Sequence, residues 1–148
     1  MYLRKISFAV IIIFTVASLL SCRPSYRKRP ISYHRLGPLS DFTQPEIELD
    51  KHNLLLRRDD DGFYIMSTVC TYDLTYLQRQ NIEGKQIYVS SYSDSKYDLE
   101  GNVLSGPSVR HLPYYELKID AATYDGPKDT LYAYVGREVP KTWRLKIE

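Results

Sequence analysis

The chain is poor in the residues that define several unusual protein classes. Its 148 residues include only two cysteines, seven glycines, eight prolines and one tryptophan, while 43% are hydrophobic. This composition excludes collagen-like, low-complexity and disordered proteins, because enough apolar side chains are present to build a core. The length is typical of one folded domain rather than two.

Acidic residues are missing from the first 36 positions. Residues 1–21 contain Arg4 and Lys5, and residues 22–36 contain five further bases. The remaining segment, 37–148, carries 13 Lys and Arg against 18 Asp and Glu, a net charge of −5. So acidic a domain argues against nucleic-acid binding, which requires a basic surface.

A hydrophobic run long enough to span a membrane is also missing. Residues 6–21 are uncharged, shorter than the ~20 apolar residues of a transmembrane helix. A short apolar run after a basic start is typical of a secretory signal peptide. The run ends in Leu19-Leu20-Ser21-Cys22, which resembles the lipobox of bacterial lipoproteins. An uncleaved transmembrane anchor with an incidental Cys22 is the alternative.

The lipobox resemblance implies an organisation in three parts. Residues 1–21 are the signal peptide, residues 22–37 the lipidated N-terminus and basic tether, and residues 38–148 the folded domain. Acyl chains on Cys22 would hold the protein in the bilayer. Arg23 after this cysteine, rather than Asp, implies the periplasmic face of the outer membrane in the bacterial cell envelope. The bases of the tether are either a solvated spacer or a contact to anionic headgroups.

The domain is predicted to be all-β. No segment after residue 37 has a sustained 3.6-residue apolar period, whereas short runs rich in β-branched and aromatic residues alternate with turn signals. Strands are expected at 46–49, 53–57, 63–69, 86–89, 96–98, 115–119, 130–135 and 142–147. The Asp59–Gly62 segment predicts a hairpin turn between the second and third of these strands.

Sequence motifs of catalysis are absent. The chain has no nucleophile elbow, no glycine-rich phosphate loop and no His-Glu-x-x-His motif. No nucleophile–base pair is visible, so we do not expect an enzyme. The three histidines, His34, His52 and His111, are scattered along the chain and are predicted to be surface or turn residues rather than metal ligands.

Two segments resemble the cluster-binding loops of Rieske iron–sulfur proteins. The first, residues 61–72, ends in Cys70-Thr-Tyr, where the family has Cys-Thr-His. The second, Ser90-Ser-Tyr-Ser-Asp-Ser-Lys-Tyr-Asp-Leu-Glu-Gly-Asn102, resembles the family's second loop, which is usually Cys-Pro-Cys-His-Gly-Ser-x-Phe-Asp followed by Gly-Asn. Gly106-Pro107 matches the family's proline loop. The resemblance covers residues 54–119 and implies a Rieske-like antiparallel β-sandwich of small sheets.

Three of the four cluster ligands of that family are replaced. A Rieske centre uses two Cys thiolates on one iron and two His on the other. Cys70 is retained, but the other ligand positions are Tyr72, Ser90 and Ser93. Ionising a phenol near pH 7 costs about 4 kcal/mol before any metal is bound, and a serine hydroxyl is a poorer donor still. The four positions are therefore expected to be vestigial, with no cofactor and no metal.

Further replacements suggest how the loops are held together. The positions of the family's disulfide are Thr75 and Tyr92, and its loop glycine is Asp94. We expect hydroxyl hydrogen bonds between the loop tips, with the ring of Tyr72 or Tyr92 in the space of the cluster. Cys70 is expected to be a buried relic.

Two functions remain open at this stage. The first is a lipid-anchored, non-redox interaction or scaffolding module that contacts an unidentified membrane or periplasmic protein through residues 70–76, 90–96 and 106–113. The second is a 2Fe-2S electron-transfer protein of a respiratory chain with atypical ligands. Less favoured alternatives are a mononuclear metal site formed by Cys70, Asp73 and Asp94, and a small-molecule binder.

Overall fold

The protein is built almost entirely from antiparallel strands, which confirms the predicted all-β class. The computed structural model describes residues 30–120 and 129–147. Two short 3-10 helices, η1 (Leu39–Asp41) and η2 (Asp50–His52), interrupt the strands of these residues. The strands are β1 (Ser32–Pro38), β2 (Glu46–Leu49), β3 (Leu54–Asp59), β4 (Gly62–Ser67), β5 (Leu77–Ile82), β6 (Lys85–Ser90), β7 (Lys96–Tyr97), β8 (Val103–Ser105), β9 (Tyr114–Asp120) and β10 (Thr130–Val139).

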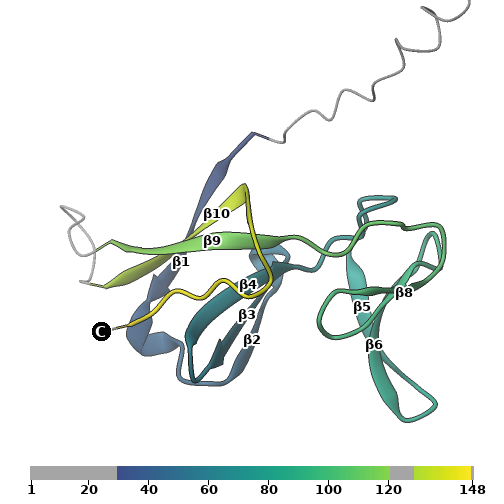
Figure 1. Cartoon of the computed structure of the whole chain (residues 1–148), viewed down its shortest axis with the longest axis horizontal. Helices are drawn as coiled ribbons and strands as arrows, with labels where there is room; N and C mark the ends of the chain where they lie inside the picture. Colours follow the sequence, from purple (N-terminus) through teal and green to yellow (C-terminus); the bar gives the residue numbers. More distant parts are fainter. Residues whose placement is uncertain (1–29, 121–128, 148) are drawn as a thin grey trace, which may run out of the picture.

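The strands form two sheets that lie side by side in Figure 1. The larger sheet has six strands in the order β1-β10-β9-β4-β3-β2, and the smaller has four in the order β5-β6-β7-β8. The smaller sheet is inserted between β4 and β9, which pair with each other in the larger one. The chain therefore leaves the larger sheet at the end of β4 and returns at β9, so the segments flanking these two strands meet where the sheets join.

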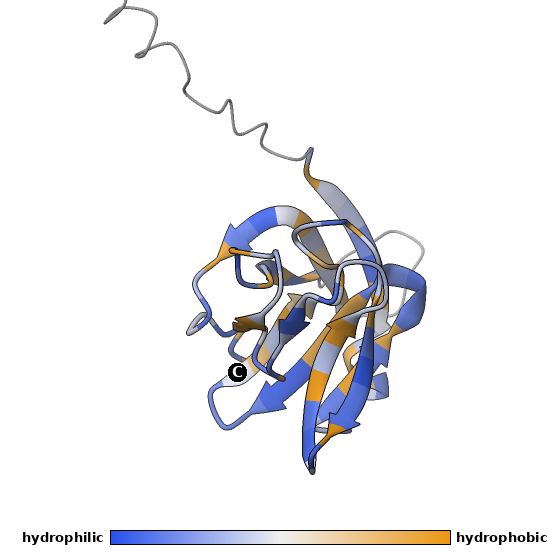
Figure 2. Ribbon diagram, turned by 90° about the vertical axis from the view of Figure 1, so that its right-hand side faces the viewer, coloured by the Kyte–Doolittle hydropathy of each residue, from blue (hydrophilic) through white to orange (hydrophobic). Residues whose placement is uncertain are grey.

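The leucine run of β3 serves two hydrophobic cores. Leu54 and Leu56 belong to a core within the six-stranded sheet, whereas Leu55 belongs to a second core that it shares with Tyr88 and Tyr97 of the smaller sheet. Side chains alternate across a strand, so three consecutive leucines can only be buried if both faces are covered. Figure 2 shows bands of hydrophobic (orange) and hydrophilic (blue) residues along the strands. Consequently β3 lies at the centre of the packing.

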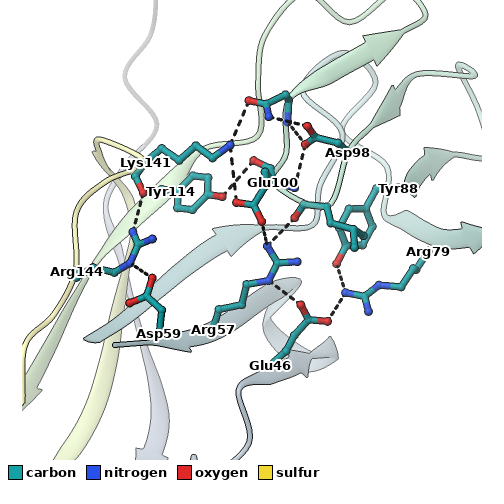
Figure 3. Close-up of polar contacts among 12 residues, drawn as sticks. Glu46, Arg57, Asp59, Arg79, Tyr88, Asp98, Glu100, Tyr114, Lys141 and Arg144 are labelled. Carbon is teal, nitrogen blue, oxygen red and sulfur yellow. Dashed lines mark hydrogen bonds and ion pairs between the residues drawn. The ribbon is translucent and has the colours of Figure 1, made fainter. Parts of the chain in front are cut away.

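A half-buried ion network also connects the two sheets (Figure 3). Arg57 of β3 donates to Glu46 of β2 at 2.7 Å and to the Leu99 carbonyl oxygen at 2.7 Å. Arg79 of β5 pairs with the same Glu46 and donates to the hydroxyl of Tyr88 at 2.9 Å. Although burial opposes ionisation, the two guanidinium groups lower the pKa of Glu46. The two strands of the larger sheet are thereby joined to the smaller one.

Four segments differ from the strands that the sequence predicts: β1, β5, β8 and residues 142–147. β1 occupies residues 32–38, so most of this strand lies within the predicted tether of residues 22–37. β5 and β8 were not predicted, because β5 is mostly polar and exposed and β8 has only three residues. Segment 142–147 is not a strand: it makes only one bridge, between Phe63 and Leu145, after a turn at Pro140.

The predicted signal peptide and Cys22 lie outside the described residues. Within residues 30–120 and 129–147, no helix is both long enough and apolar enough to cross a membrane.

Candidate functional site

Three loops meet at one end of the smaller sheet, and we call them the loop tips: residues 68–76, 91–95 and 106–113. Ser90, at the end of β6, donates a hydrogen bond to Asp73 of the first loop at 2.6 Å. Thr71 of the first loop contacts the hydroxyl of Ser108 in the third at 2.6 Å. The segments singled out by the Rieske resemblance are therefore neighbours in space.

Cys70 lies buried beneath the loop tips. Its Sγ is 3.4 Å from the hydroxyl of Tyr97 and 3.9 Å from Oγ of Ser93. The Tyr97 hydroxyl also accepts a hydrogen bond from the Thr71 amide at 3.1 Å and donates to Ser108 at 2.7 Å. Burial raises the pKa of Tyr97, so this phenol remains a neutral hydrogen-bonding group. Cys70 is a free thiol.

Ser90 is the centre of a second cluster of hydrogen bonds. Besides donating to Asp73, its fully buried hydroxyl accepts from the backbone amides of Tyr92 and Ser93, each at 3.2 Å. Thr75 donates to the other carboxylate oxygen of Asp73 at 2.7 Å and lies 3.1 Å from Ser90. The first and second loops are thus joined by a carboxylate bound by two hydroxyls.

These hydrogen bonds stabilise the charged form of Asp73. Desolvation alone would raise the pKa of this carboxyl, but the hydrogen bonds from Ser90 and Thr75 outweigh it and hold the pKa well below its usual range. Charge-assisted hydrogen bonds are roughly twice as strong as neutral ones. Asp73 is therefore an ionised residue whose hydrogen bonds join the first two loops.

The third loop packs against the second through Gly106. This glycine has φ +97°, and a Cβ placed there would be 2.6 Å from the Cα atom of Ser95 and 2.8 Å from the carbonyl oxygen of Asp94. Only glycine allows so close an approach of two backbones. Asp94, at the position of the family's loop glycine, itself has a positive φ of 56°.

The four ligand-position residues do not all converge. Cys70, Ser90 and Ser93 lie close to one another, whereas the ring of Tyr72 is 61% exposed. Tyr92 is 83% exposed, so the prediction that Tyr72 or Tyr92 fills the space between the loops is wrong. The buried ring at this place is that of Tyr97, which occupies the Phe position of the second motif. The aromatic position of the second motif is the sequence signal that could have identified Tyr97 as the buried ring.

The predicted alternative of a mononuclear metal site finds no support in the geometry. Asp73 is bound by Ser90 and Thr75, and among the described residues no three His, Cys, Asp or Glu side chains are close enough to hold an ion together. Sequence reasoning also missed one pair: Nδ1 of His34 lies 3.1 Å from Nδ1 of His52, although the two residues are 18 positions apart.

Large apolar side chains are exposed on the loop tips. Tyr92 and Val109 are the most exposed, at 83% and 96%. The others in these loops are Tyr72, Leu74 and Tyr76. Beside the third loop lies a groove of about 370 Å³, lined by residues that include Val109, Leu112, Pro113 and Val139. The groove is also lined by charged side chains, among them Arg110, Glu138 and Lys141. The loop tips therefore combine a hydrogen-bonded interior with an exterior on which large apolar side chains lie beside charged ones.

No family model matches the chain, and no curated protein matches it either.

Proposed function

We propose that the protein is a lipid-anchored envelope lipoprotein whose Rieske-like domain holds no iron–sulfur cluster and acts as a non-redox interaction or scaffolding module. This proposal depends on one observation, which concerns the residues at the four positions that match the cluster ligands. Where a cluster would need four donors aimed at two irons, hydroxyl groups are hydrogen-bonded to one another and to backbone amides.

The chemistry of the donors supports the absence of a cluster. The Ser90 hydroxyl already donates a hydrogen bond to Asp73 and accepts one from each of two backbone amides, so binding iron would break these three hydrogen bonds. Tyr72 faces outward, and its phenol would have to ionise at a cost of about 4 kcal/mol near pH 7. Cys70 alone cannot hold two irons. The residues present therefore do not fit a 2Fe-2S centre, and we assign no electron-transfer step to the domain.

The exterior of the loop tips supports a role in binding another protein. Protein interfaces are enriched in aromatic residues, and tyrosine gives a large contact area at low entropic cost. Tyr72, Tyr76 and Tyr92 project from loops whose backbone is fixed by internal hydrogen bonds. A surface fixed in this way pays little ordering entropy when a partner binds. The partner is expected to be a membrane or periplasmic protein that presents an apolar patch.

Reconstitution with iron and sulfide tests the redox alternative. The full chain, purified in detergent, is incubated with both reagents under reducing conditions and then examined by visible absorption and EPR. We expect a colourless protein that unfolds cooperatively. A Rieske-type EPR signal with two irons per chain would refute the proposal and establish the electron-transfer alternative.

The anchor and the contact surface are tested separately. Replacing Cys22 by Ala should remove the acyl mass and release the protein from the membrane fraction. For the surface, a Tyr72→Ser, Tyr92→Ser double variant should recover less partner than the wild type in pull-downs from solubilised native membranes. Tyr33→Ser is the matched control, because Tyr33 of β1 is 67% exposed but outside the loop tips. Equal recovery by all three proteins would contradict the proposed surface.

A further inference from the structure

The two ends of the six-stranded sheet approach each other at a pair of histidines. β1 and β2 are the edge strands of this sheet. His34 belongs to β1, and His52 belongs to η2, which directly follows β2. Their rings meet edge to face, with centroids 5.2 Å apart and planes at 85°. The sheet therefore curls until a contact between two imidazoles spans its seam.

The facing atoms of the two rings are both Nδ1, at a separation of 3.1 Å. On the other side of the His34 ring, Nε2 lies 2.9 Å from the hydroxyl of Ser32. We propose that His34 and His52 form a binding site for one borderline divalent cation of the Zn²⁺, Ni²⁺ or Cu²⁺ class, which cross-links the seam of the sheet.

The separation of the two nitrogens fits this chemistry. Zn–N bonds of ~2.0–2.1 Å at a tetrahedral angle place two ligand nitrogens about 3.3 Å apart. To admit the ion, the pair has to open by a few tenths of an ångström, and each ring has to turn by about 35° so that its Nδ1 lone pair faces the metal rather than the other nitrogen. Imidazole is a preferred ligand of Zn²⁺, Ni²⁺ and Cu²⁺, whereas Mg²⁺ prefers oxygen.

The protonation states are also consistent with a metal site. In a hydrogen bond between two neutral imidazoles, one Nδ1 carries the proton and the other accepts it. When the cation binds, the ring that carried its proton on Nδ1 transfers it through water to Nε2. Both rings are then Nε2–H tautomers, both Nδ1 lone pairs face the ion, and no net proton is released. The Nε2–H group of His34 then donates to Ser32. Hydrogen bonds of this kind orient most metal-binding histidines in proteins.

A bound ion would connect elements at opposite edges of the sheet. Water or an external ligand completes the coordination, because the two histidines supply only two positions. Since the unfolded chain keeps the two histidines apart, the ion binds the folded state preferentially. At 100 times the dissociation constant it would raise the folding equilibrium constant about 100-fold.

Titration of the full chain without a histidine tag, in detergent, tests the site. Zn²⁺ and Ni²⁺ are added separately and followed by calorimetry and by the ¹⁵N shifts of the imidazole nitrogens, with Mg²⁺ as the negative control. We expect one ion per chain, with Nδ1 shifts at His34 and His52 only. His34→Gln and His52→Gln should each lower the affinity at least 10-fold, and Ser32→Ala should lower it about 10-fold.

His111 provides the matched control. It is the third histidine of the chain, and its Nδ1 accepts a hydrogen bond from the Val103 amide at 3.2 Å. His111→Gln should bind Zn²⁺ as the wild type does. Binding that survives in both His34→Gln and His52→Gln, or the absence of a 1:1 complex in the wild type, would overturn the proposal. The shifts are measured on the wild type, so they decide the question even if a variant does not fold.

Discussion

Replacing Ser90 by Ala removes the central hydroxyl of the loop tips. The variant leaves one oxygen of Asp73 and the amides of Tyr92 and Ser93 without the partner they have in the wild type. A hydrogen bond to a charged group contributes about 1.5–3 kcal/mol, and an orphaned buried amide costs about 1–3 kcal/mol. The Asp73 carboxylate is partly solvated, and water can reach part of the loop. We therefore expect a loss of about 2–4 kcal/mol in the free energy of unfolding.

Urea denaturation followed by circular dichroism measures this loss. The control is Ser91→Ala, because Ser91 is the exposed neighbour of Ser90 in the sequence. Surface substitutions of that kind usually change stability by less than about 0.5 kcal/mol. Combining Ser90→Ala with Asp73→Ala gives a double-mutant cycle, in which we expect a coupling energy of about 1–2 kcal/mol.

Two results would refute this reasoning. If Ser90→Ala were no less stable than Ser91→Ala, the hydroxyl cluster would not hold the loops together. If the losses from Ser90→Ala and Asp73→Ala were additive, the two side chains would act independently despite their 2.6 Å hydrogen bond.

Three further predictions concern the loops and the ion network. In thermal unfolding, Gly106→Ala should lower the free energy of unfolding by about 1–3 kcal/mol more than Gly84→Ala. Both glycines have positive φ, but of the two only Gly106 lies against another backbone segment. Equal losses in the two variants would contradict the close approach. Arg57→Met should lower stability in urea by about 2–4 kcal/mol, because Arg57 is buried and binds both sheets. The exposed Arg58→Met variant should stay within about 0.5 kcal/mol, and a similar loss there would contradict a specific role of Arg57. Because folding lowers the pKa of Asp73, its contribution is complete above the unfolded value of about 3.9 and is lost as the pH falls below it. Stability measured between pH 5 and pH 3 should therefore fall less steeply in Asp73→Asn than in the wild type, and equal slopes would contradict this role of Asp73.

Strands were predictable where the side-chain pattern and the turn chemistry agreed. The Asp59–Gly62 turn between two apolar runs specified the β3–β4 hairpin, whose register is regular from Leu54–Ser67 to Asp59–Gly62. β5 was not predictable because a mostly exposed strand of polar residues has no apolar alternation. Its extended conformation depends on its hydrogen bonds to β6. β1 lies after a basic, proline-containing segment and depends on β10, almost a hundred residues later, for its hydrogen bonds.

The candidate site was predictable as a set of neighbouring loops but not in its interior. The motif spacing brought Cys70, Ser90 and Ser93 together. The aromatic position of the second motif marked Tyr97, but the spacing alone did not exclude Tyr72 or Tyr92, since that choice depends on the backbone direction at each loop. Tyr97 is the buried residue of β7, whereas Tyr92 lies in a turn and is exposed. The His34–His52 pair was invisible for a similar reason, because it depends on how far the large sheet curls.

The hydrogen bonds of the loop tips hold the three loops together without any contribution from their exposed apolar side chains. Asp73, Ser90 and Thr75 join the first two loops, and Thr71 and Ser108 join the first to the third. The outward rings are not required for these contacts, so their exposure is not a consequence of poor packing within the domain. Single exposed apolar side chains are ordinary, whereas several large ones gathered on one surface mark an interaction site. The interior hydrogen bonds thus account for how the three loops are held together, and the interaction proposal accounts for the apolar side chains outside them.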